Sequence, residues 1–470
     1  MKISTPNVIL LTIDCLRFDH LGCYGYWRDT SPNIDNLASK GALFLEAISN
    51  GGITPFAFPS ILASALPPLE EGEDREILRR NSTLAGLLKE AGYRTAAFHS
   101  NPYLARPFNY GKGFDIFEDS QGKMDAALKQ KFKLEAKLAM RLKPLKASRF
   151  GRSVIRFLAK LWWLPNLFSS FVAGPPIIRA GGLTRQAIQS LATHKGKFFL
   201  WLHYMDVHRP YMPFPEYLSQ FRTQPVSRRK MVILFHKIVE NPSQLSPSEV
   251  TTLVDLYDAD IKYVDDAVGR LLDSLGSDLS NTIVIVTADH GQEFEEHGKF
   301  GYQTLYDTLV HVPLIIAGPG IKGGTLVKQQ VSLIDLAPTI ADFLGIDNAP
   351  SFHGESLLPV IRSKREAVNG TISTTFRPGQ RLIAYRIPGW KYILTESLDA
   401  NDVVLAEELY DLTNDPGETK NLHGVDIEEA KRFQLEARNK LSQFKQLKSK
   451  EKTAYAKQRI KAKFKKLGKL

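Results

Sequence analysis

Short apolar runs alternate with amphipathic segments along much of this chain. The runs at 8–13, 94–98, 198–205, 283–286 and 312–317 have the length and composition of buried strands. Between them, apolar residues recur at intervals of three and four, which predicts helices over 84–91, 248–275 and 332–345. Strands that alternate with crossover helices predict an α/β fold with a central, mainly parallel sheet flanked by helices.

Three segments depart from this alternation. Residues 124–185 carry a basic block and a tryptophan-rich apolar run, so we interpret them as an insertion in a main domain of residues 1–369. Residues 370–425 contain short strand-like runs, which predict a small C-terminal α+β subdomain. Residues 426–470 form one charged helical pattern without an obvious large apolar face, so we expect a basic helical tail that is solvated or disordered.

The composition narrows the class of protein. The 470 residues are 43% hydrophobic and 24% charged, which excludes a fibrous or wholly disordered chain. The two cysteines, Cys15 and Cys23, form neither a disulfide framework nor a paired zinc-knuckle spacing, and they favour a reducing, cytoplasmic compartment. The longest apolar stretch, 161–173, contains Pro165 and is shorter than a membrane span, so we expect no transmembrane helix.

The positive net charge of +11 is confined to two segments. Residues 431–470 hold 15 Lys and Arg against two Glu, and residues 128–160 hold 11 against one. The first segment could adhere to anionic lipid or RNA, and the second, beside the tryptophan-rich run, could be an interfacial anchor or a lid. Solvated helices remain the alternative for both. We expect peripheral contact with an anionic membrane and no specific nucleic acid, because neither segment has regularly spaced aromatic platforms.

Acidic side chains follow two of the predicted strands. Asp14 comes directly after the first strand, and Asp289 and His290 follow the strand at 283–286. Ligands collect at the carboxyl ends of parallel strands, so these side chains are candidates to hold one divalent cation: zinc, manganese or calcium. By itself, Asp14 could equally cap the helical segment that follows it.

Eight segments, in order, resemble the sulfatase family of the alkaline-phosphatase superfamily. This resemblance implies an alkaline-phosphatase-like α/β fold, a divalent metal and attack on a sulfate or phosphate ester. The segments are NVILLTIDCLRFDHLGCYGY, TSPNIDNLASKGALF, STLAGLLKEAGYRTAAF with GFDIFED, FLWLHYMDVHRPYMP, YDADIKYVDDAVGRLLDSLG, TADHGQEFEEHG, LYDTLVHVPLIIAGPG and ELYDLTNDPGETKNL.

The resemblance assigns roles to single residues. Asp14 corresponds to the first metal aspartate of the family, and Asp289 with His290 corresponds to the later metal pair. His208 corresponds to a histidine that contacts the substrate or the leaving group, although it could also be a structural histidine. His203, in the same segment, is assigned to substrate binding.

The motif of the family nucleophile is altered. The family has a cysteine or serine, oxidised to formylglycine, two residues before a proline, but this position is Ala57, so no formylglycine is expected. Thr54 lies five residues before Pro59, as does the threonine nucleophile of the similar phosphoethanolamine transferases, and a metal-bound hydroxyl there could attack in line. The alternatives are that Thr54 caps a helix or that Ser60 is the hydroxyl.

Two further family positions also differ. Many sulfatases have a second aspartate directly after the first, but this position is Cys15. One oxygen ligand is therefore missing, and the expected metal preference shifts from calcium towards zinc or manganese. The family lysine that binds sulfate oxygens corresponds to Tyr302. Lys299 and His297 could supply positive charge to the ester instead.

These observations predict a metal-dependent sulfatase-like hydrolase that uses Thr54, His208 and Lys299 on a sulfate or phosphate ester. Two alternatives stay open. One is a transferase of phosphoethanolamine or phosphoglycerol groups. The other is a catalytically inactive binding protein. It would explain the altered positions Cys15, Ala57 and Ile61, the last of which corresponds to an arginine in the family motif.

Overall fold

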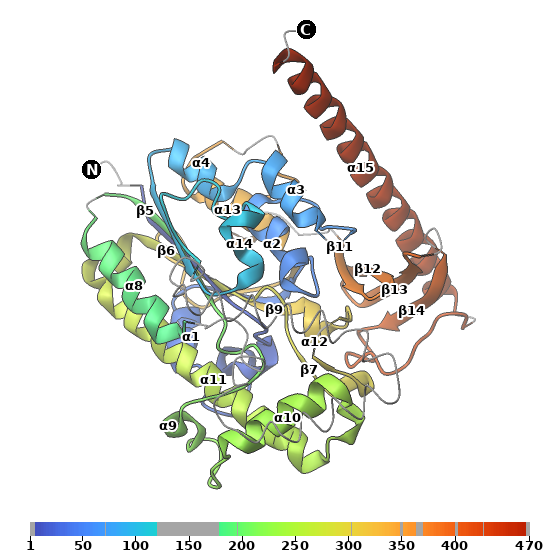
Figure 1. The fold of residues 1–470 in the computed structure, drawn as a ribbon, viewed down its shortest axis with the longest axis horizontal. Coiled ribbons are helices and arrows are strands. Elements are labelled where there is room, and N and C mark those ends of the chain that lie inside the picture. Colours follow the sequence, from blue (N-terminus) through green and yellow to red (C-terminus); the bar gives the residue numbers. More distant parts are fainter. Residues whose placement is uncertain are drawn as a thin grey trace, which may run out of the picture.

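A large mixed sheet forms the centre of the molecule, whose computed structural model describes residues 5–70, 72–119, 178–194, 196–301, 303–347, 351–362, 370–399, 403–425 and 427–466. Its eight strands lie in the order β10-β2-β9-β6-β1-β5-β3-β4, and β9 alone runs against the other seven (Figure 1). In that order the strands span Thr325–Ser332, Ala42–Ile48, His311–Ala317, Thr282–Thr287, Asn7–Ile13, Phe198–Tyr204, Arg94–His99 and Ile116–Glu118. The predicted mainly parallel sheet is confirmed.

Helices cover both faces of this sheet. Helices α1 (Pro32–Ser39), α8 (Ala180–Ala192) and α11 (Pro247–Ser274) lie on one face. Helices α2 (Thr54–Ala63), α4 (Leu84–Glu90), α13 (Leu336–Phe343) and α14 (Leu358–Ile361) lie on the other. The remaining helices described are α3 (Glu73–Arg80), α9 (Pro215–Leu218), α10 (Arg228–Glu240) and α12 (Asp307–Val310).

Side chains cap the N-termini of two predicted helices, α4 and α11. Thr83 accepts a hydrogen bond from the backbone of Gly86 at the start of α4. Ser246 and Glu249 form a reciprocal capping box at the start of α11, with Pro247 in its first turn. Strand β1 is buried at all seven positions, because both of its neighbours are strands and both faces of the sheet are covered.

The end of the predicted insertion needs correction. We placed it at residue 185, but α8 begins at Ala180 and packs its buried side chains Ala180, Leu183 and Ala187 into the main core. Arg179 forms ion pairs with Asp206 and Asp260, which hold the start of this helix. Residues 180–185 therefore belong to the main domain, whereas the basic block and the tryptophan-rich run of the insertion lie outside the described residues.

A second, four-stranded antiparallel sheet forms the C-terminal subdomain. It consists of β11 (Thr371–Arg377), β12 (Gln380–Ile387), β13 (Trp390–Ser397) and β14 (Val404–Asp411). A third sheet pairs only β7 (Glu293–Phe294) with β8 (Phe300–Gly301).

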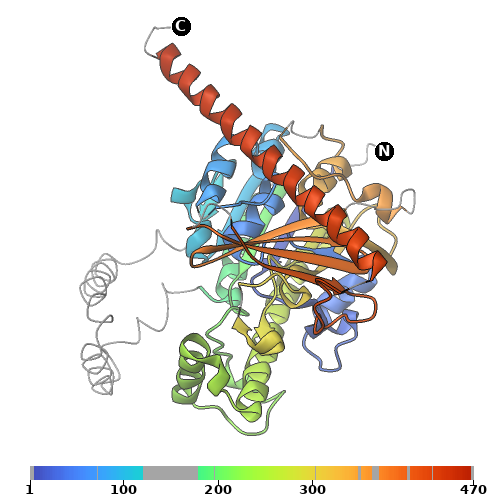
Figure 2. The same ribbon diagram turned by 90° about the vertical axis from the view of Figure 1, so that its right-hand side faces the viewer.

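The last helix, α15 (Glu428–Lys466), corrects the prediction for the tail. Its first half lies across the C-terminal sheet, Lys448 and Lys452 farther along pair with Glu73 and Glu70 of the main domain, and its C-terminal end extends past the rest of the molecule in both views (Figure 1, Figure 2). A stripe at intervals of three and four residues packs with Tyr385 and Tyr392 of the sheet; its members are Ala430, Phe433, Ala437, Leu441 and Phe444. This narrow stripe escapes a search for a large apolar face, because mostly polar and charged residues occupy the positions between its members.

Candidate active site

Polar side chains from neighbouring strands converge at the carboxyl edge of the central sheet. Asp14 follows β1, and Asp289 and His290 follow β6, which lies beside it. His203 lies near the end of β5, on the other side of β1, and Asn101 follows β3. All are buried, and the parallel order of these strands brings their ends together.

Asp14 is the centre of this set, and its two oxygens have different neighbours. Oδ2 accepts a hydrogen bond from Asn101 Nδ2 at 3.0 Å and lies 3.2 Å from His203 Nε2. Thr54 Oγ1 donates to the same oxygen at 3.4 Å. Oδ1 accepts a hydrogen bond from the thiol of Cys15 at 3.1 Å and faces His290 Nε2 at 3.8 Å.

Thr54 reaches Asp14 because it is the first residue of α2. The helix begins there, with Pro55 in its first turn, so Ala57 lies inside the helix rather than at its tip. Ser60 is fully buried and donates to the carbonyl of Ala65 at 2.8 Å, so its hydroxyl is already engaged within the helix. Of the two hydroxyls considered from the sequence, Thr54 is the one at the candidate site.

The ring of His290 is oriented for a ligand. Its Nδ1 lies 2.9 Å from the carbonyl of Gly291, which can only accept, so Nδ1 carries the proton and Nε2 presents a lone pair. Nε2 lies 3.7 Å from Asp289 Oδ2, a buried oxygen that has no hydrogen-bond donor. Buried oxygens without a partner are rare in folded proteins, and a cation between these groups would satisfy this one.

Two groups of three side chains have ligand atoms within 4.8 Å of one another, and Asp14 belongs to both. One group is Asp14, His203 and Asp289, and the other is Asp14, Cys15 and His290. The donors are two carboxylates, imidazoles and a thiol, a set that suits a divalent transition metal such as zinc. The residues present therefore fit the metal that the sequence led us to expect.

The two carboxylates differ in their electrostatics. Burial alone would raise the pKa of Asp14, but the hydrogen bond with His203 and the charges of His208 and His290 hold it below its ordinary value. Burial raises the pKa of Asp289, and the negative charge of Asp14 raises it further. The two carboxylates thus repel each other in a dry site, and a metal cation would relieve this repulsion.

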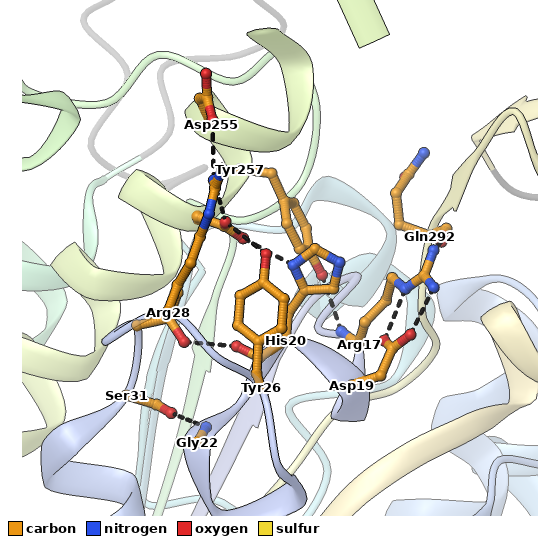
Figure 3. A network of polar contacts seen from close by, with 12 residues as sticks. Arg17, Asp19, His20, Gly22, Tyr26, Arg28, Ser31, Asp255, Tyr257 and Gln292 are labelled. Atoms are coloured by element: carbon orange, nitrogen blue, oxygen red, sulfur yellow. Dashed lines mark hydrogen bonds and ion pairs between the residues drawn. The ribbon is translucent and has the colours of Figure 1, made fainter. Parts of the chain in front are cut away.

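A network of polar contacts holds the loop after β1 against α11 (Figure 3). Tyr257 donates its hydroxyl proton to the carbonyl of Cys15 at 2.7 Å and accepts from the backbone N–H of Arg17 at 2.9 Å. The Arg17 guanidinium also donates to the carbonyl of Gln292 at 3.0 Å. Tyr257 therefore connects the segment that carries Asp14 with α11, and Arg17 connects it with the segment that follows Asp289.

Further along the same loop, charged pairs continue this connection. His20 Nδ1 lies 2.7 Å from Asp258 Oδ1, and the Arg28 guanidinium contacts both Asp255 and Asp258 of α11. These side chains touch no predicted metal ligand. They position the ligand loop instead, which is why this part of α11 is so acidic.

The other predicted site residues lie in different parts of the molecule. His208 lies just beyond β5, where its charge acts on Asp14. His297 instead stacks on Tyr306 and lies 2.9 Å from the carbonyl of Gly417, on the side of the C-terminal subdomain. Lys299 is exposed, and its charge interacts with Arg377 and Glu293 rather than with Asp14. Tyr302 lies outside the described residues.

Three functional candidates were not identified from the sequence. Asn101 could have been found by the rule that predicted Asp14, since it follows a predicted strand at the same edge. The thiol of Cys15 was considered only as a lost carboxylate. The positive charge of Arg209, beside His208, acts on both His208 and Cys15, and no motif marked it.

Comparison with known proteins shows the family of this chain. The model of the family described as Sulfatase matches residues 6–346. The chain belongs to the sulfatase family. A second model, described as the C-terminal part of N-sulphoglucosamine sulphohydrolase, matches residues 295–447 and so spans the C-terminal sheet and much of α15.

Individual sulfatases are similar over part of their length. Arylsulfatase K of Mus musculus is 36% identical over 31% of this chain and 27% of its own length. Choline-sulfatase of Rhizobium meliloti is 34% identical over 35% of this chain and 32% of its own. The chain thus spans about a third of these curated relatives. The phosphonate monoester hydrolase of Agrobacterium radiobacter has the same fold, with a TM-score of 0.67 at 19% identity over 94% of this chain and 96% of the other.

Proposed function

We propose that this protein hydrolyses a sulfate or phosphate ester with Thr54 as nucleophile, beside a divalent cation held by Asp14, Asp289 and His290. The observation that carries the proposal is the contact of Thr54 Oγ1 with Asp14 Oδ2 at the start of α2, next to the unpartnered Asp289 oxygen. The sulfatase relatives and the phosphonate hydrolase fold support this class of reaction.

Each side chain would have one task. A bound cation would supply Lewis acidity and stabilise the charge that develops on the ester oxygens. Thr54 would attack sulfur or phosphorus, and Asp14 would orient its hydroxyl through the hydrogen bond at 3.4 Å. His208, whose pKa is lowered by burial and whose charge acts on Asp14, would contact the leaving group.

His297 and Lys299 stay predictions for binding a more distant part of the substrate. His297 lines a cavity of about 610 Å³ between the main domain and the C-terminal subdomain, together with Arg17 and Arg386. Tyr302 and His203 stay predicted substrate contacts, although the geometry of His203 supports a metal ligand equally well.

The test is turnover of aryl sulfates, aryl phosphates and phosphodiesters by the protein loaded with zinc, manganese or calcium. We expect Thr54→Ala to lower turnover by roughly a thousandfold or more. Its metal content and melting temperature should stay unchanged. Ser60→Ala is the matched control, because it removes a buried hydroxyl of the same helix that does not face Asp14. Equal turnover by Thr54→Ala and the unmodified protein would refute the nucleophile assignment.

The same assay separates the two alternatives. A transferase would pass its phospho-group to added glycerol or ethanolamine faster than to water, and the spacing of Thr54 before Pro59 is the feature that keeps this alternative open. An inactive binding protein would turn over no ester with any metal.

We also propose that the second half of α15 contacts an anionic membrane surface. Residues 453–466 contain six Lys and Arg and no acidic residue, and both ribbon views show this end of the helix beyond the rest of the molecule. No helix in the described part of the chain is long and apolar enough to cross a bilayer. Both cysteines are free, which supports a reducing compartment.

Co-sedimentation with vesicles that contain anionic lipid tests this contact. The structure sets the place of truncation. Removal of residues from 431 on would remove most of the apolar stripe of α15 and uncover the sheet beneath it, so the chain should end after Lys452. We expect the shortened chain to bind vesicles more weakly and to keep its melting temperature. Equal binding by both chains would show that residues 453–470 do not contact the membrane. Binding to RNA but not to vesicles would show that anionic lipid is not the partner.

A further inference from the structure

The cysteine beside the first ligand is held in an unusual backbone conformation. Cys15 has a φ of 60°, the left-handed region that side chains other than glycine and asparagine rarely adopt. Its carbonyl is held by the hydroxyl of Tyr257, which in turn is held by the backbone of Arg17. A strained residue persists only where its surroundings enforce it, and such residues cluster at functional sites.

This conformation places the thiol among polar groups. The side chain is fully buried, and its Sγ lies 3.1 Å from Asp14 Oδ1 and 3.8 Å from His290 Nδ1. A cysteine that only fills space has aliphatic neighbours, whereas both of these are predicted metal ligands. The thiol therefore occupies the position from which a third donor would reach the same cation.

A second observation points to a ligand at this position. Asp289 Oδ2 is buried without a hydrogen-bond donor and lies 3.7 Å from His290 Nε2. The unsatisfied oxygen lies beside Nε2, the nitrogen that presents a lone pair, and ligand atoms of Asp14, Cys15 and His290 lie within 4.8 Å of one another. A cation bound here would give the Asp289 oxygen its partner.

We propose that the Cys15 thiolate is a ligand of the divalent cation and that it makes this a zinc site rather than a calcium site. The inference rests on the cation of the proposed function, but it does not depend on which ester is cleaved. Sulfur is a soft donor that zinc accepts and calcium avoids. Binding would form one metal–sulfur bond, and the thiol proton would leave to solvent. The carboxylate that the sequence led us to regard as lost would thus be replaced by a thiolate.

Cobalt(II) in place of zinc provides a direct readout, because a thiolate ligand gives cobalt an intense charge-transfer absorption in the near ultraviolet that oxygen and nitrogen ligands do not. We expect this band in the full chain loaded with cobalt and in the Cys23→Ser variant. Cys23 is the matched control, since its thiol is partly exposed and interacts with Asp35 instead. Cys15→Ser should bind cobalt without the band and bind zinc at least about tenfold more weakly.

Two further measurements guard against misfolded variants. Zinc-edge X-ray absorption of the unmodified chain and of Cys23→Ser should show a sulfur neighbour at about 2.3 Å. Cys15→Asp should keep a metal but shift its preference from zinc towards calcium and manganese by at least about tenfold. A band unchanged in Cys15→Ser, or a cobalt-loaded chain without the band, would overturn the inference.

Ester turnover by the same samples separates this inference from the proposed function. A thiolate band without turnover of any ester would support the ligand and refute the hydrolase. Turnover with a bound metal but without sulfur contact would do the opposite. A chain that binds no divalent metal would refute both.

Discussion

Two buried clusters of charge in this protein are built in opposite ways. At the carboxyl edge of the central sheet, Asp14 and Asp289 have histidines, a threonine and an asparagine around them, and one oxygen has no donor. Where the C-terminal sheet meets the main domain, Glu418 is also buried and Asp307 is largely buried. There, Lys391 Nζ lies 2.5 Å from Asp307 and 2.7 Å from Glu418, and the Arg386 guanidinium completes the pairing.

The difference indicates what each cluster is for. The chain neutralises the second cluster with its own lysine and arginine, and these charges hold the pKa of Asp307 well below its ordinary value despite burial. That cluster joins two parts of the fold and needs nothing more. In the first cluster, by contrast, Asp14 and Asp289 face histidines, and in the proposed function a cation from outside completes it.

The largest effect should come from breaking the self-neutralised cluster. Lys391 is fully buried, so Lys391→Met would leave Asp307 and Glu418 without their shared cation, and we expect a loss of about 3–5 kcal/mol in the free energy of unfolding. Lys452→Met is the matched control, because its pair with Glu70 is exposed and should be worth less than about 1 kcal/mol. Denaturant unfolding measures both. Equal losses in the two variants would contradict the contrast between the clusters.

At the site around Asp14, removal of a charged side chain should have the opposite effect on stability in the absence of metal. Excess zinc at about a thousand times its dissociation constant should stabilise the unmodified protein by about 4 kcal/mol, and a chelator should remove this gain. Asp289→Asn should abolish the response to zinc. In chelator, however, the variant should be at least as stable as the unmodified protein, because it removes one of two repelling buried carboxylates. Thermal unfolding with zinc and with chelator measures both effects, and a large loss for the variant in chelator would show that Asp289 is structural.

The smallest effect concerns the loop that carries Asp14. Burial opposes ionisation of Asp19, but its hydrogen bonds and ion pair with Arg17 lower its pKa to about 2. Because the pKa is lower in the folded state, the pair stabilises the protein above about pH 4, and this contribution is lost as the pH falls towards 2. The stability difference between the unmodified protein and Asp19→Asn should therefore shrink over this range. A constant difference from pH 5 to pH 2 would refute the linkage.

Most of the fold could be predicted because its signals are local. The runs that form β1, β5, β6 and β9 are too apolar to lie at the surface. The cap and the periodicity of α11 predict that helix in the same local way. The packing of α15 could not be predicted in the same way. Its stripe of alanine, leucine and phenylalanine is narrow, and only the presence of the C-terminal sheet beneath it makes the stripe an interface.

The candidate site, likewise, could be predicted only in part. Asp14, Asp289 and His290 each follow a strand of one parallel sheet, so their meeting could be inferred from order along the chain. The direction in which the Cys15 thiol points could not be inferred in this way. It depends on the left-handed backbone conformation of Cys15, which is held by Tyr257 from a helix more than two hundred residues away. No local pattern encodes that contact.

The sequence by itself determined the strands, their mainly parallel order and the ligand types at their ends, because hydrophobic periodicity and strand direction act over short distances. Only the tertiary structure decided that Thr54 rather than Ser60 faces Asp14, that His297 lies towards the C-terminal subdomain, and that the thiol of Cys15 joins the ligands. Those outcomes depend on where helices begin and on contacts between distant segments, which form only when the whole core is packed.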